Sequence, residues 1–322
     1  MNIPIKWLLE GPAWVQYRTH LDLLGQQEAG LREKIAGEPQ ITGLLDELSG
    51  WPGGPIKRHN DAGHLLHKLA FLADIGIPAD HPVIRQAINR ILEHQSAEGP
   101  FQVLVNIPVH FGGAGEDEWR WMLCDAPILV YILAKLGLEQ DERVLSAARH
   151  LLTLVQGNGW PCAAAPELGK FRGPGRKGDP CPYANLVMLK ALAQFPAWSE
   201  GEACRVGAES LLSLWDERTN RRPYLFAMGT DFAKLKAPLV WFDILHVLDV
   251  RSRFPWLRAD PRLKEMAFLV AAKADGQGRF TPESVWTAWK GWDFGQKKEP
   301  SRWLTLVARH VLKRMGSGDQ VW

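Results

Sequence analysis

Residues 124–155, CDAPILVYILAKLGLEQDERVLSAARHLLTLV, contain one complete copy of the pattern that decides the fold. The first part, CDAPILVYILAKL, is apolar on nearly every side, which is typical of a helix inside a protein. Its proline suits a first helical turn, where the missing N–H has no partner to lose. After a short break, apolar residues recur at helical spacing among charged ones. The stretch therefore predicts a hairpin of an inner apolar helix and an outer amphipathic helix.

The same plan recurs along the chain. Further inner helices are predicted in residues 13–24, 60–72, 179–192, 236–248 and 299–312, and further outer helices in residues 79–95, 199–215 and 259–275. Loop aromatics mark the repeats at intervals of roughly 50–65 residues, a period typical of repeat architectures. They are Trp51, Phe101, Trp160, Tyr224 and Phe280.

Inner helices backed by outer helices favour an α/α toroid over an open solenoid. We expect an all-α fold of about six helical hairpins, closed where residues 4–10 meet the C-terminal inner helix. The sequence has no Ser/Gly-rich linker, so a single domain spanning residues 1–322 is predicted.

Composition excludes several classes of protein. The formal net charge of +2 gives no electrostatic footprint for nucleic acid. The sequence contains neither a secretory signal nor an apolar run long enough for an integral membrane segment. The four cysteines form no C-x-x-C pair, so reduced thiols in a cytoplasmic protein are the simplest interpretation.

Polar residues stand where the predicted inner helices begin. In a toroid these starts share one mouth, so their side chains are the default candidates for a site. Asp61, Asp125 and Asp243 are candidate general acids, since a desolvated carboxyl has a raised pKa. Asp61 and Asp125 can equally cap helices. The stretch VWFDILHVL places Asp243 in mid-helix, with His246 three residues later. We expect these two side chains to pair, either in a structural hydrogen bond or in a functional site.

Two further groups carry chemistry. Asp179 and Cys181 are possible zinc ligands, although Asp179 can also cap a helix and Cys181 can be a small core residue. His64 and His67 lie three apart on one helix face, as an acid–base pair or as core histidines. Basic residues beside glycines suit a phosphate. They are Lys170, Arg172, Arg176 and Lys177 in one loop and Lys297, Lys298 and Arg302 in a matching one.

The repeats, with Gly–aromatic elements such as VQGNGW and ADGQGRF, resemble the α/α toroid of terpenoid cyclases and protein prenyltransferase β-subunits. The stretch GRKGDPCPY, residues 175–183, is similar to the prenyltransferase branch. That resemblance implies that Arg176 and Lys177 hold an isoprenoid diphosphate and that Tyr183 lies at the substrate. It also implies zinc on Asp179 and Cys181, with His246 as the third ligand and His59 or Cys124 as substitutes. A helical partner subunit belongs to that family.

The cyclase branch implies a different reaction. Its class II members protonate an alkene with an Asp, and Asp125 in LCDAP lies at a comparable helix start. Aromatic residues such as Trp241 suit a carbocation. The sequence therefore predicts an enzyme that acts on an isoprenoid or another small apolar substrate. A non-catalytic toroid that binds a lipid or peptide and a carbohydrate-active α/α barrel are the alternatives.

Overall fold

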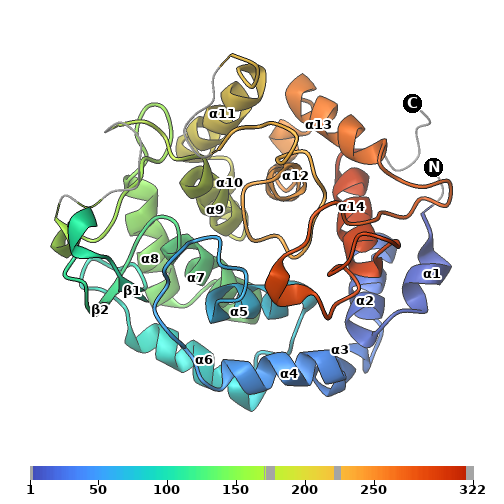
Figure 1. Cartoon of the computed structure of the whole chain (residues 1–322), viewed down its shortest axis with the longest axis horizontal. Coiled ribbons are helices and arrows are strands. Elements are labelled where there is room, and N and C mark those ends of the chain that lie inside the picture. The colour runs from blue at the N-terminus through green and yellow to red at the C-terminus, as the bar shows by residue number, and fades with distance from the viewer. Residues whose placement is uncertain (1–2, 170, 172–177, 221–225, 317–322) are drawn as a thin grey trace. The chain divides into compact units, whose positions relative to one another are not determined.

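The computed structural model describes residues 3–169, 171, 178–220 and 226–316. Helices dominate this part of the chain (Figure 1). They are α1 (Ile5–Leu9), α2 (Ala13–Arg18), α3 (Leu31–Lys34), α4 (Pro39–Leu48), α5 (Leu65–Ile75), α6 (Pro82–Glu93), α7 (Ala126–Leu133), α8 (Glu142–Thr153), α9 (Pro182–Leu192), α10 (Pro196–Ser199), α11 (Glu202–Asp216), α12 (Ile244–Arg251), α13 (Pro261–Ala271) and α14 (Arg302–Arg314).

The chain divides into two compact units. The first comprises residues 1–44, 71–78 and 228–322, and the second comprises residues 45–70 and 79–227. The boundary between them falls within α4 and α5.

In the second unit, α9 packs against α7, α8 and α11, and α7 packs against α8 (Figure 1). Every residue of α7 and α9 is buried, which is why both stretches read as apolar all round. The neighbouring helices α8 and α11 bury one face only, and Asp141 caps α8 by accepting the Arg143 amide at 2.9 Å. The expected all-α pairing of inner with outer helices, as in an α/α toroid, is confirmed.

The first unit repeats this pairing and adds an aromatic core. In it α12 packs against α13 and α14, and α14 packs against α2. Six aromatic side chains meet with ring centroids 4.9–5.8 Å apart, mostly edge to face. They are Trp14, Phe71, Trp289, Trp292, Phe294 and Trp303. Four of the 15 tryptophans therefore serve packing in this cluster.

One element departs from the expected all-helical chain. Strands β1 (Val103–Asn106) and β2 (Asp117–Arg120) form an antiparallel hairpin, with Val103 paired to Arg120 and Asn106 to Asp117. Alternate residues of β1 are buried, as expected for a strand with one covered face.

Candidate functional site

Three loop segments of the second unit converge where α7 and α9 begin. The backbone of residues 121–123 pairs with that of residues 163–165, and the Cys181 amide donates to the Trp160 carbonyl at 2.8 Å. Pro161 also forms a bridge with Pro180. These segments bring three cysteines near one another: Cys124, Cys162 and Cys181.

Asn185, in α9, holds two of these loop segments together through its side chain. Its side chain is completely buried, and its amide nitrogen donates to the carbonyls of Trp160 at 2.9 Å and Cys181 at 2.8 Å. Its amide oxygen accepts the Trp160 N–H at 2.9 Å. A buried side chain that satisfies three backbone groups fixes both segments, because leaving such groups unpaired is costly.

Asp125 lies at the N-cap of α7 and makes no capping bond with its side chain. Its carboxylate is completely buried and faces His59 instead, with Oδ1 3.1 Å and Oδ2 3.0 Å from the imidazole Nδ1. The His59 side chain is 29% exposed. Burial acts to lower the pKa of His59, but the Asp125 carboxylate and Cys181 outweigh it, so the pKa lies above the ordinary value of 6.5.

Cys181 lies at the N-cap of α9 and is hydrogen-bonded to Cys124 through their side chains. That bond lowers the pKa of the Cys181 thiol most. The backbone N–H groups of Ala184 and Tyr183 and the charge of His59 act in the same direction, and the pKa falls from 9.0 to about 7. The same bond, together with burial, raises the pKa of Cys124 well above its ordinary value. These opposite directions favour Cys124 as the S–H donor and Cys181 as the thiol that loses its proton first.

Two buried groups complete the surroundings. His67 donates from Nε2 to the carbonyl of His59 at 2.8 Å, and burial lowers its pKa from 6.5 to about 4. His67 is thus a neutral histidine that holds the His59 backbone. Tyr183 is completely buried, and burial raises the pKa of its phenol well above 10.0. We name these residues, His59, Cys124, Asp125 and Cys181 with His67 and Tyr183 behind them, the thiol–imidazole cluster.

Other predicted site residues of the second unit lie differently. Asp61 is exposed and accepts the Gly63 amide at 3.0 Å, as a turn residue does. His64 contacts the Gly54 carbonyl at 3.0 Å and accepts the Leu66 amide at 3.1 Å, so it serves the backbone. Asp179 is exposed, and it does not cap α9, because the N-cap of this helix is Cys181. Lys170, Arg172, Arg176 and Lys177 lie outside the described residues.

In the first unit, the predicted mid-helix position of Asp243 is wrong. Residues 235–243 form no helix, α12 begins at Ile244, and Asp243 is the N-cap that accepts the His246 amide at 3.0 Å. The Asp243 carboxylate therefore binds the backbone of His246. The His246 ring is hydrogen-bonded elsewhere, through Nδ1 to the Trp241 carbonyl at 2.8 Å. Burial raises the pKa of the completely buried Asp243 to about 6.

The remaining predicted contacts of the first unit lie at its surface or along α14. Lys297 and Lys298 are exposed. Arg302 donates from Nε to the Trp7 carbonyl at 3.0 Å, and its guanidinium lies 4.9 Å from the centre of the Trp7 ring. This arginine therefore joins α1 to the start of α14.

Sequence reasoning missed the contact between His59 and Asp125, although it named both residues. It also passed over Asn185 and Lys190 of α9, which are both buried. The Lys190 ammonium lies 4.6 Å from the centre of the Tyr131 ring. A polar residue inside a helix that is otherwise apolar all round was the available signal for both.

Within the described part of the chain, His, Cys, Asp and Glu side chains form no group of three or more arranged to hold a metal ion. The zinc site stays a prediction, and metal analysis of the purified protein tests it. None of the helices in the described ranges is long and apolar enough to cross a bilayer.

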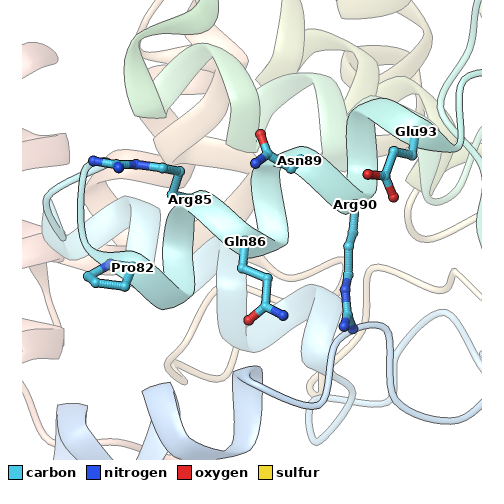
Figure 2. Close-up of a pocket in the computed structure, with 6 residues that line it drawn as sticks. All are labelled: Pro82, Arg85, Gln86, Asn89, Arg90 and Glu93. Carbon is cyan, nitrogen blue, oxygen red and sulfur yellow. The ribbon is translucent and has the colours of Figure 1, made fainter.

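A hollow of about 410 Å³ lies over one face of α6 (Figure 2). Its lining comes from α6 alone: Pro82, Arg85, Gln86, Asn89, Arg90 and Glu93. Arg85 donates to the Asp80 carbonyl at 3.1 Å, and Arg90 donates to the Trp51 carbonyl. This hollow shares no residue with the thiol–imidazole cluster, and its arginines serve the backbone.

No protein-family model and no curated protein matches the sequence. Solved structures do resemble the chain. One is a type II terpene cyclase, MstE from Scytonema, in complex with geranylgeranyl dihydroxybenzoate. It is 14% identical, with 95% of this chain and 88% of that chain covered and a TM-score of 0.41. Another is a GH76 α-mannanase from Bacteroides thetaiotaomicron, 13% identical, with 97% and 86% covered and a TM-score of 0.46.

Both solved structures are less than 15% identical to this chain and have TM-scores below 0.5. Their identities and TM-scores are too low to carry any conclusion about what this chain binds or does.

Proposed function

We propose that this chain is an enzyme of acyl transfer that uses Cys181 as nucleophile, His59 as proton carrier and Asp125 as the group that orients the imidazole. The observation that carries the proposal is the contact between His59 Nδ1 and the buried Asp125 carboxylate, 3.0 Å long, beside a thiol at a helix start.

The contact with Asp125 determines which imidazole nitrogen can react. With Nδ1 held by the carboxylate, Nε2 is the atom that exchanges a proton with a neighbouring group. A nucleophile, a base and a carboxylate that orients the base are the three parts of a catalytic triad, recognised by geometry rather than by position in the sequence. His59 retains 29% exposure, so the imidazole is within reach of a substrate.

The surroundings of Cys181 favour a nucleophile over an inert core thiol. Cys181 is only partly buried, and its sulfur accepts from Cys124 near the positive end of α9. Cys204 gives the contrast within the same unit: it is completely buried, and burial raises its pKa to about 12. A thiolate beside an imidazolium is the reactive form of cysteine enzymes.

The proposed reaction has two steps. The Cys181 thiolate adds to the carbonyl carbon of an ester or thioester, and the His59 imidazolium gives its proton to the leaving group, which departs and leaves a thioester on Cys181. Water or an acceptor alcohol then loses its proton to His59, attacks the thioester and releases the Cys181 thiolate.

The test uses p-nitrophenyl acetate and p-nitrophenyl decanoate as probes with the full-length reduced protein. We expect a rapid burst of nitrophenolate, and peptide mapping should find the acyl group on Cys181. Cys181→Ser should abolish the burst, and His59→Ala should slow it by about 10²–10⁴-fold, the usual contribution of general acid–base catalysis. Cys204→Ser is the matched control. Acylation of Cys162 instead, or a burst that survives Cys181→Ser, contradicts the proposal.

The complete burial of Asp125 favours a second candidate, in line with the resemblance to terpenoid cyclases. A buried carboxyl group, when protonated, can give its proton to an alkene, and His59 can return one to it. In this version the substrate is an isoprenoid, and the carboxyl group acts in place of the thiol.

Product analysis separates the two candidates. With squalene and geranylgeranyl diphosphate as probes, the second candidate predicts cyclised products that Asp125→Asn abolishes and Cys181→Ser leaves in place. No cyclised product from folded wild-type protein rules it out with these probes.

A further inference from the structure

Cys124 is the one thiol of the cluster that the proposed reaction does not use as a reacting group. It precedes α7, is 8% exposed, and its S–H is hydrogen-bonded to Cys181 at the start of α9. Both sulfurs therefore lie at the starts of two helices, α7 and α9, that pack against each other. Two thiols that are hydrogen-bonded to each other are neighbours, which is the first requirement for a disulfide.

The two thiols differ in how they can be reached. Cys181 is half-buried, whereas Cys124 is buried. An oxidant from solvent therefore meets Cys181 first, and the product on Cys181 meets Cys124 next. This order of access is that of a redox-sensitive cysteine with a resolving partner.

We propose that Cys124 and Cys181 are a reversible disulfide pair, in which a peroxide oxidises Cys181 and Cys124 resolves the product. The pair adds redox control to the site and rests on the proposed function for its consequence, since the disulfide removes the nucleophile. The chemical class of the oxidant is a small hydroperoxide, and that of the reductant is a dithiol.

The oxidation of the two thiols to the disulfide takes two steps. The Cys181 sulfur attacks one oxygen of hydrogen peroxide, the O–O bond breaks, and sulfenic acid and one water form. The Cys124 sulfur then attacks the Cys181 sulfur, the S–O bond breaks, and the hydroxyl leaves as a second water with the Cys124 proton. Two thiols thereby lose two electrons and two protons, and peroxide is reduced to water. A dithiol returns both electrons by exchange through a mixed disulfide.

Cys162 is the competitor that makes the proposal specific. It is half-buried and its charge acts on Cys124, so it lies in the same neighbourhood. It follows the loop residue Pro161, however, and stands at no helix start. We therefore expect the bond to form between Cys124 and Cys181.

The test treats the full-length reduced protein with hydrogen peroxide, blocks the remaining thiols and maps the peptides without reduction. We expect a peptide that joins Cys124 to Cys181, which dithiothreitol removes. In Cys124→Ser, Cys181 should accumulate as the sulfenic acid that dimedone traps. Cys162→Ser should still form the disulfide. A bond from Cys181 to Cys162, or sulfinic acid on Cys181 with no disulfide in the wild type, overturns the proposal.

This experiment contains no ester, so its outcome is separate from that of the burst assay. A disulfide without a burst retains the redox pair and rejects acyl transfer. A burst without a disulfide rejects the redox pair alone.

Discussion

The substitution Cys124→Ala probes the cluster most sharply. The hydrogen bond from Cys124 is the largest of the causes that lower the pKa of Cys181 from 9.0 to about 7. Removing the donor destabilises the thiolate, while the backbone N–H groups of α9 and His59 still favour it. We expect the pKa of Cys181 to rise, and to rise more than in His59→Ala.

The size of the effect has a bound. At pH 7 a thiol with a pKa of about 7 is about half ionised, and one with a pKa of 9.0 is about 1% ionised, so complete reversion lowers the thiolate population about 50-fold. A more basic thiolate is also a stronger nucleophile, with a Brønsted slope of about 0.4–0.5. The rate of alkylation at pH 7 therefore falls by at most about 5–8-fold, and the midpoint of the pH–rate curve is the clearer observable.

The assay follows alkylation of Cys181 by iodoacetamide with peptide mass spectrometry over a pH series. Cys204→Ala is the matched control, because that thiol is completely buried and contacts the Trp198 carbonyl at 3.3 Å instead of Cys181. A curve for Cys124→Ala that superimposes on the wild-type curve would refute the assignment of Cys124 as the donor.

Three further outcomes follow from buried polar groups. The pKa of His67 is lowered from 6.5 to about 4, so the native state binds fewer protons than the unfolded state between these values, and stability present above pH 6.5 should fall by up to about 3 kcal/mol as the pH drops to 4. The pKa of Asp243 is raised from 3.8 to about 6, so Asp243→Asn, which keeps an acceptor for the His246 amide, should stabilise the protein above pH 6 by up to about 3 kcal/mol and have no such effect below pH 3.8. Asn185→Ala leaves the buried Trp160 amide unpaired and removes one of two donors to the Trp160 carbonyl, which still accepts the Cys181 amide, and should lower the free energy of unfolding by about 1–3 kcal/mol.

Urea unfolding over a pH series measures all three changes. His67→Gln is the reference for the first, because a side chain that cannot charge should flatten the pH dependence. A variant Asp243→Asn that is less stable than wild type at pH 7, or a variant Asn185→Ala as stable as wild type, contradicts the corresponding account.

The helices could be predicted because a helix with one buried face has apolar residues at helical spacing, and a helix buried on all sides is apolar throughout. The apolar stretches that end at Leu133 and Leu192 form α7 and α9. The amphipathic stretches that follow each of them form α8 and α11. The start of α12 was missed by several residues, because residues 236–243 are largely apolar, like the helix that follows, yet form no helix. The β1–β2 hairpin was missed because each strand has only four residues, too few to show a clear alternating pattern.

The site was predicted only in its members. Asp125, Cys124 and Cys181 each precede an inner helix, and this position marked them in the sequence. Which groups meet depends on loop pairing, such as the bond from Cys181 to Trp160, and no local pattern encodes that. The sequence therefore left Asp125 equally open to capping, whereas its carboxylate contacts His59.

The proposed reaction and the proposed redox pair both require Cys181 to be the reactive thiolate of this chain. Limited labelling of the reduced wild-type protein with iodoacetamide over a pH series, followed by peptide mapping, tests it most directly. We predict that Cys181 is labelled before Cys124, Cys162 and Cys204, with a midpoint near pH 7. Labelling that begins at another cysteine, or a Cys181 midpoint near pH 9, contradicts the claim.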